Sequence, residues 1–362
     1  MMNHRPIRIW LALCLFCLLV VTGCASSLTP NPKAGDISAA VPLNVGFSRN
    51  PSYLPWLVAK EEDLFKSLHQ NIDAKWFEDY GTSVEALASG LLDLNSQSAS
   101  DTIYSVAEGA DLSIVLAIDR SMGNEKIIAS DAIQTTADLK GKKIALAEGV
   151  AHHLLLLLGL QKAKLTLNDV VIQTLDSEAA TEAFTTGKVD VIGISAPYTT
   201  FALARNGSRE LWSSVNFPGL FFNTLSVDRQ TLDRYPEKIE GAIEAWSRTL
   251  KYMQEHRDRA YEIMSDRADV SIETFKSYDS ALKRLNLEEN AIDFRSKNTL
   301  DSFSLALETI SQLLLESGTI ETKPEVAQLL DRRFVDTHIE INSATKKPKK
   351  IERIRTFKVR PS

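Results

Sequence analysis

The sequence predicts an α/β protein with two domains, each built on a mostly parallel sheet flanked by helices. Three observations support this fold class. The 362 residues exceed what one compact core normally holds. Short apolar runs of strand type alternate with longer runs of helix type along residues 43–194. Residues 138–160 join a strand, a glycine turn and an apolar helix, which together make half of a βαβ unit.

The segment 138–160 carries the clearest local signal. Residues 142–147 predict a buried strand, and a helix follows from His152. The leucines at 154–158 leave this helix without a polar face, and they are too few to cross a bilayer, which takes about 20 apolar residues. We therefore expect the helix to pack against a sheet. Because its first turn has N–H groups without intrahelical partners at the sheet's carboxyl edge, we expect a small polar or anionic molecule there.

The first domain is expected to begin with a strand at 43–47 and a helix at 54–65, with Ser52 as the N-cap. A strand at 72–77 and a helix at 84–92 form the next step, and a strongly apolar strand follows at 112–118. Residues 95–101 are unusually polar for the end of a buried strand. This polarity predicts that they face a ligand.

The second domain is expected to start after residues 119–125, a polar break between strand-like runs that predicts a crossover. Its strands are expected at 126–129, 142–147, 170–175 and 189–194, and its helices at 152–163, 177–186 and near Tyr198. An apolar run at 217–227 is expected to return the chain to the first domain. Helices are then expected at 236–254, 258–265, 272–285, 300–315 and 324–330.

The amino terminus predicts an export signal. Arg5 and Arg8 precede an apolar core and a small-residue site that ends at Cys24, which resembles a bacterial lipobox. We expect residues 1–23 to be removed as a signal peptide and Cys24 to be acylated as the mature N-terminus. The alternative is an uncleaved membrane anchor. Residues 24–40 are rich in Ser, Ala and Pro and are expected to form a flexible tether.

Composition excludes several classes of site. Cys14, Cys17 and Cys24 are the only cysteines, so the folded part has no thiol for nucleophilic catalysis, zinc or an iron–sulfur cluster. Without residues 1–23, 39 basic residues stand against 47 acidic ones, a formal charge of −8. This balance argues against nucleic acid as a partner. No cofactor is expected.

Short motifs, each weak alone, occur in a specific order along residues 41–336. They are ADLKGKK at 137–143, Glu148-Gly149 and His153 before the leucine-rich helix, EALASGLLD at 85–93, NDV at 168–170, AFTTGKVD at 183–190, APYT at 196–199 and RFV at 333–335. With the lipobox, this order resembles the substrate-binding proteins of ABC importers. More narrowly, it resembles the nitrate, sulfonate and taurine group, which also includes binders of thiamine precursors.

The resemblance implies a periplasmic-binding-protein fold of type II, in which two α/β lobes joined by two crossover strands close on a ligand. It places lobe 1 at 41–120 plus 224–340, lobe 2 at 121–223, and a basic tail at 341–362. It also implies a monomer, held at the membrane by Cys24 on the periplasmic side, that delivers its ligand to an ABC permease. The sequence departs from many relatives at Ser195-Ala196-Pro197, where a Trp-Glu-Pro-like stretch is usual.

Strand ends on the two lobes are expected to converge on one cleft. The candidate ligand-binding residues are those that follow these strands or lie at the crossover: Ser48, Arg49, Asn50, Tyr53, Asp79, Tyr80, Ser98, Ser100, Asp101, Asp119, Ser121, Asn124, Glu148, Gly149, Val150, Ala151, His152, His153, Ser195, Pro197 and Tyr198. For the Ser and Asn residues, capping of turns is an equally good interpretation.

Two types of candidate have specific alternatives. Arg49 could clamp an anion, although a lone arginine after a strand is more often a surface ion pair. His152 and His153 do not predict a metal pair, because neighbours on a helix point about 100° apart and only one can face the cleft.

The sequence alone leaves two alternative functions open. One is an enzyme on the same fold, for which the family includes a pyrimidine-precursor synthase with a cysteine-rich motif that this chain lacks. The other is a lipoprotein that senses its ligand without transport. Residues 346–360 hold eight basic residues against Glu352, as expected of a solvated tail or of a segment that binds anionic head groups.

Overall fold

The computed structural model describes residues 41–147, 149–296 and 302–336. The predicted signal peptide, Cys24, the tether, Glu148 and the basic tail lie outside these residues. All described helices and strands belong to one compact unit, Pro42–Ser362. None of the described helices is long and apolar enough to span a bilayer.

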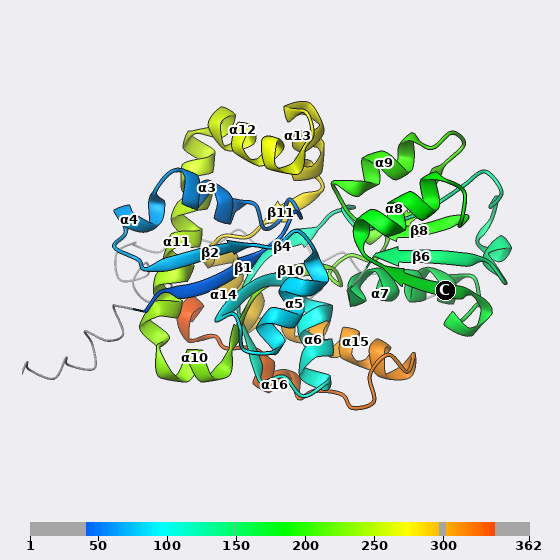
Figure 1. The fold of residues 1–362 in the computed structure, drawn as a ribbon. Helices are drawn as coiled ribbons and strands as arrows, with labels where there is room; N and C mark the ends of the chain where they lie inside the picture. Colours follow the sequence, from blue (N-terminus) through cyan, green and yellow to red (C-terminus); the bar gives the residue numbers. More distant parts are fainter. Residues whose placement is uncertain (1–40, 148, 297–301, 337–362) are drawn as a thin grey trace, which may run out of the picture. The chain divides into compact units, whose positions relative to one another are not determined.

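The first sheet has six strands in the order β11-β4-β10-β3-β1-β2 (Figure 1). Strand β1 pairs in parallel with β2 and β3, whereas β10 is antiparallel to both β3 and β4, and β11 is antiparallel to β4. Strands β1 to β4 therefore run in one direction and β10 and β11 in the other. The strands are β1 (Leu43–Phe47), β2 (Ile72–Trp76), β3 (Leu94–Ser98), β4 (Leu112–Ser121), β10 (Phe222–Asp228) and β11 (Leu282–Arg284).

The second sheet has five strands in the order β7-β6-β8-β5-β9, and only β5 runs against the others. Successive side chains of its inner strands lie in two different hydrophobic cores. In the strand at 143–147, Ile144 and Leu146 belong to one core and Ala145 and Ala147 to the other. Burial of both faces explains why these strands are apolar throughout. The strands are β5 (Lys126–Ala129), β6 (Lys143–Ala147), β7 (Val171–Leu175), β8 (Val191–Ile194) and β9 (Arg209–Ser213).

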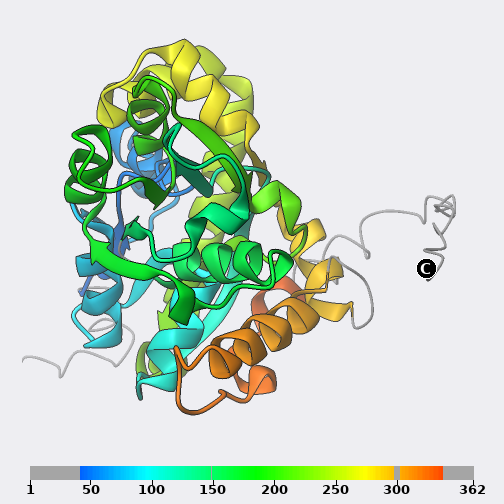
Figure 2. The same cartoon turned by 90° about the vertical axis from the view of Figure 1, so that its right-hand side faces the viewer.

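Helices cover both faces of the second sheet. Helix α7 (Val150–Lys162) packs on one face, and α8 (Ser177–Thr185) and α9 (Tyr198–Ala204) pack on the other (Figure 1). Helix α7 also contacts α6 (Ala99–Ala107) and α15 (Phe303–Glu316), as Figure 2 shows from a second direction. Its leucines at 154–158 are at most 8% exposed, so the predicted burial against protein is confirmed.

The first sheet is covered by helices from both ends of the chain. Helices α3 (Pro55–Glu61) and α5 (Tyr80–Ala88) pack against its strands, and α11 (Pro236–Glu255) packs on α3. Trp56 of α3 and Trp246 of α11 meet in this core with ring centroids 5.1 Å apart. The remaining helices are α4 (Leu64–Ser67), α10 (Arg229–Arg234), α12 (Arg257–Ala268), α13 (Ile272–Ser280), α14 (Leu287–Arg295) and α16 (Val326–Leu329), with short 3₁₀ turns at Thr136–Leu139, Leu167–Asp169 and Ser214–Asn216.

Several predicted boundaries were wrong. The helix expected at 54–65 is interrupted at Asp63, which has the left-handed φ of 52° and separates α3 from α4. The helix expected at 272–285 ends at Ser280, because the chain then pairs as β11 at the edge of the first sheet. The apolar strand expected at 112–118 continues to Ser121. Helix α7 begins two residues earlier than expected, at Val150.

Two chain crossings connect the sheets. Strand β4 of the first sheet leads into β5 of the second, and β9 of the second leads back into β10 of the first. The two crossings touch, because Ser121 and Ser214 share a hydrogen bond of 2.7 Å and the Gly123 N–H donates to Ser214 Oγ at 2.9 Å. The crossings expected near 119–125 and 217–227 are therefore present in the chain path.

Candidate functional site

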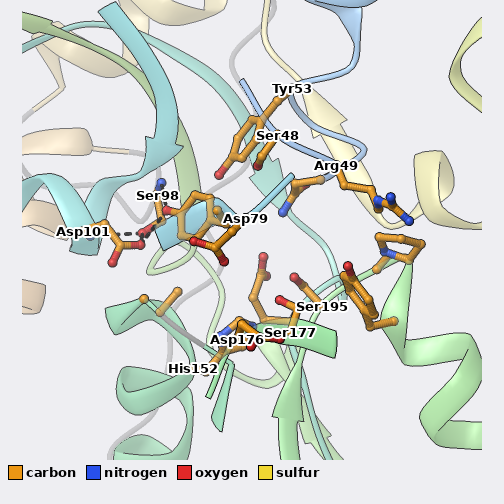
Figure 3. A pocket seen from close by; sticks show the side chains of 18 of the residues that line it. Ser48, Arg49, Tyr53, Asp79, Ser98, Asp101, His152, Asp176, Ser177 and Ser195 are labelled. Atoms are coloured by element: carbon orange, nitrogen blue, oxygen red, sulfur yellow. Dashed lines mark hydrogen bonds between the residues drawn. The ribbon is translucent and has the colours of Figure 1, made fainter. Parts of the chain in front are cut away.

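A cavity of about 250 Å³ lies where the carboxyl ends of strands from both sheets meet (Figure 3). Most of the lining residues follow a parallel strand, and parallel strands bring their carboxyl ends to one edge. The lining consists of Ser48, Arg49, Asn50 and Tyr53 after β1, Glu78, Asp79 and Tyr80 after β2, Ser98 and Asp101 at β3, Gly149, Ala151 and His152 after β6, Asp176, Ser177 and Glu178 after β7, Ser195, Ala196, Pro197 and Tyr198 after β8, and Glu125 and Asn223 at the crossings.

The buried carboxylate of Asp101 joins the two sides of this cavity. Its Oδ2 accepts hydrogen bonds from Tyr80 Oη at 2.6 Å and from Ser98 Oγ. Its Oδ1 accepts from the backbone N–H of Val150 at 2.7 Å, across 49 residues of sequence. The first amide of α7, which we expected to bind a ligand, is thus occupied by a carboxylate of the chain itself.

Gly149 makes this contact possible. Its φ of +103° is one that residues with a Cβ rarely adopt. A Cβ at this position would lie 3.0 Å from the Tyr80 ring and 3.3 Å from the Asp101 carboxylate. Glycine therefore lets the β6–α7 turn approach α6 closely.

His152 lies at the wall formed by α7 (Figure 3). Its Nδ1 is 3.3 Å from the carbonyl oxygen of Ala147, which can only accept, so Nδ1 carries the proton and Nε2 is an acceptor. Burial lowers the pKa of His152 to about 4. The imidazole is therefore neutral at pH 7.

His153 points elsewhere. Its Nε2 lies 3.4 Å from Thr174 Oγ1 and its Nδ1 lies 3.4 Å from the Gly149 carbonyl oxygen, and it does not line the cavity. Only one of the two histidines thus faces the cavity, as the helical geometry predicts. No cluster of three or more His, Cys, Asp or Glu side chains in the described ranges could hold a metal ion.

Arg49 forms a surface ion pair instead of standing free. Its Nη2 is 3.2 Å from Glu78 Oε2, and Arg267 binds the other oxygen of Glu78 at 2.9 Å. These contacts support the surface-pair interpretation of Arg49. Its guanidinium still lies at the cavity rim.

Three candidate residues at the crossing, Asp119, Ser121 and Asn124, form hydrogen bonds behind the cavity wall. Asp119 Oδ1 accepts from Asn223 Nδ2 at 2.8 Å, and Asn223 Oδ1 accepts from Tyr53 Oη at 2.8 Å. Burial raises the pKa of Asp119 to about 6. Asn124 Nδ2 donates to Glu125 Oε1 at 3.2 Å, and Ser121 bonds to Ser214. Asp119, Ser121 and Asn124 do not line the cavity themselves.

The polar run 95–101 does not face a ligand as a whole, contrary to the sequence interpretation. Asn95 bonds to Gln97 at 2.9 Å, Gln97 bonds to Thr102 at 3.0 Å, and Ser96 accepts from Trp56 Nε1 at 2.9 Å. These side chains form a network inside the first sheet. From this run, Ser98 and Asp101 line the main cavity and Ser100 lines a small neighbouring one.

Sequence reasoning missed six lining residues: Glu78, Glu125, Asp176, Ser177, Glu178 and Asn223. A signal existed for three of them, because Asp176 to Glu178 follow a predicted strand and open a predicted helix, the same position that the other candidates occupy. Asp176 caps α8 by accepting from the Ala179 N–H at 2.7 Å.

Buried polar atoms on the cavity wall lack partners within the described structure. Ser48 Oγ, Glu125 Oε2 and His152 Nε2 accept or donate no hydrogen bond, although their residues are 1%, 6% and 7% exposed. An unpaired buried polar group costs about 1–3 kcal/mol. Arg49 Nε is a fourth unpartnered buried atom of the lining, and all four atoms would gain from a polar molecule in the cavity.

Comparison with known proteins agrees with this arrangement. The family model described as "NMT1/THI5 like" matches residues 50–260. A putative aliphatic sulfonates-binding protein of Bacillus subtilis is 25% identical over 333 residues, which is 90% of this chain and 96% of the relative.

Two solved structures show the same fold. The periplasmic aliphatic sulphonate binding protein of Escherichia coli has a TM-score of 0.63 and 23% identity, and the match covers 88% of this chain and 96% of that one. The desulfurization enzyme DSZB has a TM-score of 0.59 and 14% identity, with 83% and 99% covered. The fold class is therefore confirmed as that of periplasmic binding proteins. With its family model matched over more than half its length, the chain belongs to the NMT1/THI5-like family.

Proposed function

We propose that this protein is the solute receptor of an ABC importer, which captures a small polar molecule in the cavity between the two sheets and delivers it to a permease. The observation that carries this proposal is the cavity itself, where six strand ends supply polar side chains and four buried polar atoms lack a partner. The relatives named as binding proteins support the same function.

A receptor fits the chemistry of the cavity better than an enzyme does. The lining serines do not pair with the imidazole: Ser98 donates to the Asp101 carboxylate, and His152 Nε2, the ring nitrogen that could take a proton, has no hydroxyl partner. Nucleophilic catalysis requires a hydroxyl within hydrogen-bond reach of its base. The same fold does carry an enzyme in DSZB, so the proposal depends on these contacts and not on the fold.

The proposal includes an extracytoplasmic location and an acyl anchor at Cys24. Acyl chains contribute about 0.8 kcal/mol of membrane affinity per buried CH₂, and the segment 24–40 contains no apolar stretch that could replace them. We place the folded body as a monomer on the periplasmic side. The relative of known structure from Escherichia coli is itself described as periplasmic.

Closure around the ligand follows from the two chain crossings. We take 41–120 with 224–340 as one lobe and 121–223 as the other, each with its own sheet. Gly123, with a φ of +113°, lies in the first crossing, where a residue free to adopt unusual dihedrals can absorb rotation.

A thermal-shift panel of nitrate, sulfonates, pyrimidines, ureas and amines tests the proposal. A ligand at 100 times its Kd adds about 2.7 kcal/mol to the free energy of unfolding. Ser177→Trp should abolish the shift, because Ser177 lines the cavity and its side chain makes no hydrogen bond that the fold needs. Thr185→Trp is the matched control, since Thr185 lies exposed at the end of the same helix. A shift of equal size in both variants would place binding outside the cavity.

A further inference from the structure

We propose that the ligand carries a positively charged nitrogen group, an ammonium or amidinium with several N–H donors, and not a sulfonate or another anion. This inference rests on the proposed function of the cavity. Three independent features of the wall support it: its charge, the occupants of its helix N-termini, and the chemistry of its unpartnered atoms.

Carboxylates dominate the charge of the wall. Six line the cavity, on Glu78, Asp79, Asp101, Glu125, Asp176 and Glu178, whereas Arg49 is the only guanidinium or ammonium among the lining residues. The Arg49 charge is already balanced by Glu78 at 3.2 Å. His152 adds no positive charge, because burial holds its pKa near 4. An anion in this cavity would meet several like charges, each of which repels it.

Helix N-termini are the usual anion sites of an α/β protein, but at three of them here a carboxylate of the chain already accepts from one of the amides. Asp79 accepts from the Thr82 N–H of α5 at 2.7 Å, Asp101 accepts from the Val150 N–H of α7 at 2.7 Å, and Asp176 accepts from the Ala179 N–H of α8 at 2.7 Å. A sulfonate would have to displace a carboxylate to reach any of these three amides.

Most of the unpartnered buried atoms on the wall are hydrogen-bond acceptors, so they would bind donor groups of a ligand. His152 Nε2 is a lone-pair acceptor because Nδ1 carries the proton, and Glu125 Oε2 is a carboxylate oxygen. Ser48 Oγ can accept or donate. The one unpartnered donor of the wall is Arg49 Nε, which suits a single oxygen on the ligand. Several N–H groups with one oxygen match this set, whereas the three acceptor oxygens of a sulfonate do not.

Paired probes test the charge directly. We would titrate the protein by calorimetry at pH 7.5 with ammonium and sulfonate compounds on the same skeletons: propyl, butyl and benzyl ammonium chlorides, and the sodium propyl, butyl and benzyl sulfonates. The ammonium member should bind more tightly in each pair that binds. Tighter binding of the sulfonates would overturn the charge assignment but leave the receptor function intact. Binding by neither series would overturn the charge assignment, whereas the absence of a thermal shift with every compound of the wider panel would overturn the receptor function, so the two failures are distinguishable.

Glu125→Gln gives a second test on the same probes. It removes the charge next to the unpartnered oxygen and keeps the shape of the side chain. Loss of a hydrogen bond to a charged group should weaken ammonium binding by about 10- to 150-fold. Glu182→Gln, exposed on α8 and paired with Lys188 at 2.7 Å, is the control and should bind as the parent does. Unchanged ammonium affinity in a folded Glu125→Gln protein would contradict the proposal.

Discussion

Replacing Asp101 by asparagine should loosen the first turn of α7 from the first sheet. Both Asp101 oxygens accept from donors: Oδ1 from the Val150 N–H at 2.7 Å, and Oδ2 from Tyr80 Oη at 2.6 Å and from Ser98 Oγ. Asparagine is uncharged, and its NH₂ group faces either the Val150 N–H, which can only donate, or the Tyr80 and Ser98 hydroxyls, which would have to turn from donors into acceptors. At least one buried hydrogen bond to a charged group is therefore lost, which costs about 1.5–3 kcal/mol.

Hydrogen exchange followed by mass spectrometry measures the loss of this hydrogen bond as faster exchange of the backbone amides near Val150. If the Val150 amide opens more easily by 1.5–3 kcal/mol, a peptide covering residues 150–153 should exchange about 10- to 150-fold faster than in the parent. Asp93→Asn is the matched control. Asp93 accepts from the Asn44 backbone N–H at 2.7 Å and from Thr231 Oγ1 at 3.0 Å, so it makes comparable bonds within the first sheet and none to α7.

Comparing the two variants separates the loss of the Asp101–Val150 hydrogen bond from a general loss of stability. Asp93→Asn should lower the denaturant midpoint without a specific effect on residues 150–153. If Asp101→Asn leaves exchange of these residues unchanged, or if both variants raise it equally, then Asp101 does not hold α7 and its carboxylate does not occupy the first amide of that helix.

Three further predictions follow from other parts of the chain. Cys24→Ser should release the protein from the membrane fraction, and a substituted protein that is cleaved yet stays bound would contradict acyl anchoring. Gly159→Ala should lower the free energy of unfolding by about 1–3 kcal/mol in urea, because the new methyl would lie 2.0 Å from the Trp212 ring; full stability would refute this packing. The raised pKa of Asp119, about 6, favours the protonated native state, so this group's contribution to stability is lost as pH rises from about 4 to 6. Relative to the parent, Asp119→Asn should therefore gain about 2 kcal/mol between pH 4.5 and 7.5 in urea titrations, and a difference that does not change with pH would contradict it.

Helices and strands with a clear apolar pattern could be predicted from the sequence. Strands that form only because a neighbouring strand offers an edge to pair with could not. The leucines of α7 required burial on several sides, and the structure provides a sheet and two helices for them. Strand β11 has three residues and exists because β4 offers an open edge. Strand β9, RELWS, alternates weakly and pairs only with β5, so its sequence alone does not distinguish it from a loop.

The candidate site divides in the same way. Positions after parallel strands, such as Ser48, Tyr80 and Ser195, line the cavity because strand direction fixes where the chain emerges. The bond between Asp101 and Val150 depends on how the two sheets face each other, and no local pattern contains that information. Glu125 was missed for the same reason: in the sequence it is the last residue of a polar linker, and only the arrangement of the two sheets places it at the cavity.

The polar run 95–101 shows a different limit of sequence reasoning. Its polarity is real, but most of it is satisfied within the first sheet, where Gln97 bonds to Thr102 and Trp56 donates to Ser96. A buried polar network and a ligand-binding edge have the same composition. Only the direction of each side chain separates them.

Small-angle X-ray scattering with and without ligand measures whether the two lobes close on a bound molecule. If the two sheets form the walls of one trap, rotation about the crossings near Gly123 and Ser214 must bring the lobes together when the tightest binder of the panel fills the cavity. We expect the radius of gyration to fall at saturating ligand in the parent and to stay constant in Ser177→Trp. An unchanged radius of gyration in the parent, with calorimetry showing the site filled, would contradict a receptor that closes on its ligand.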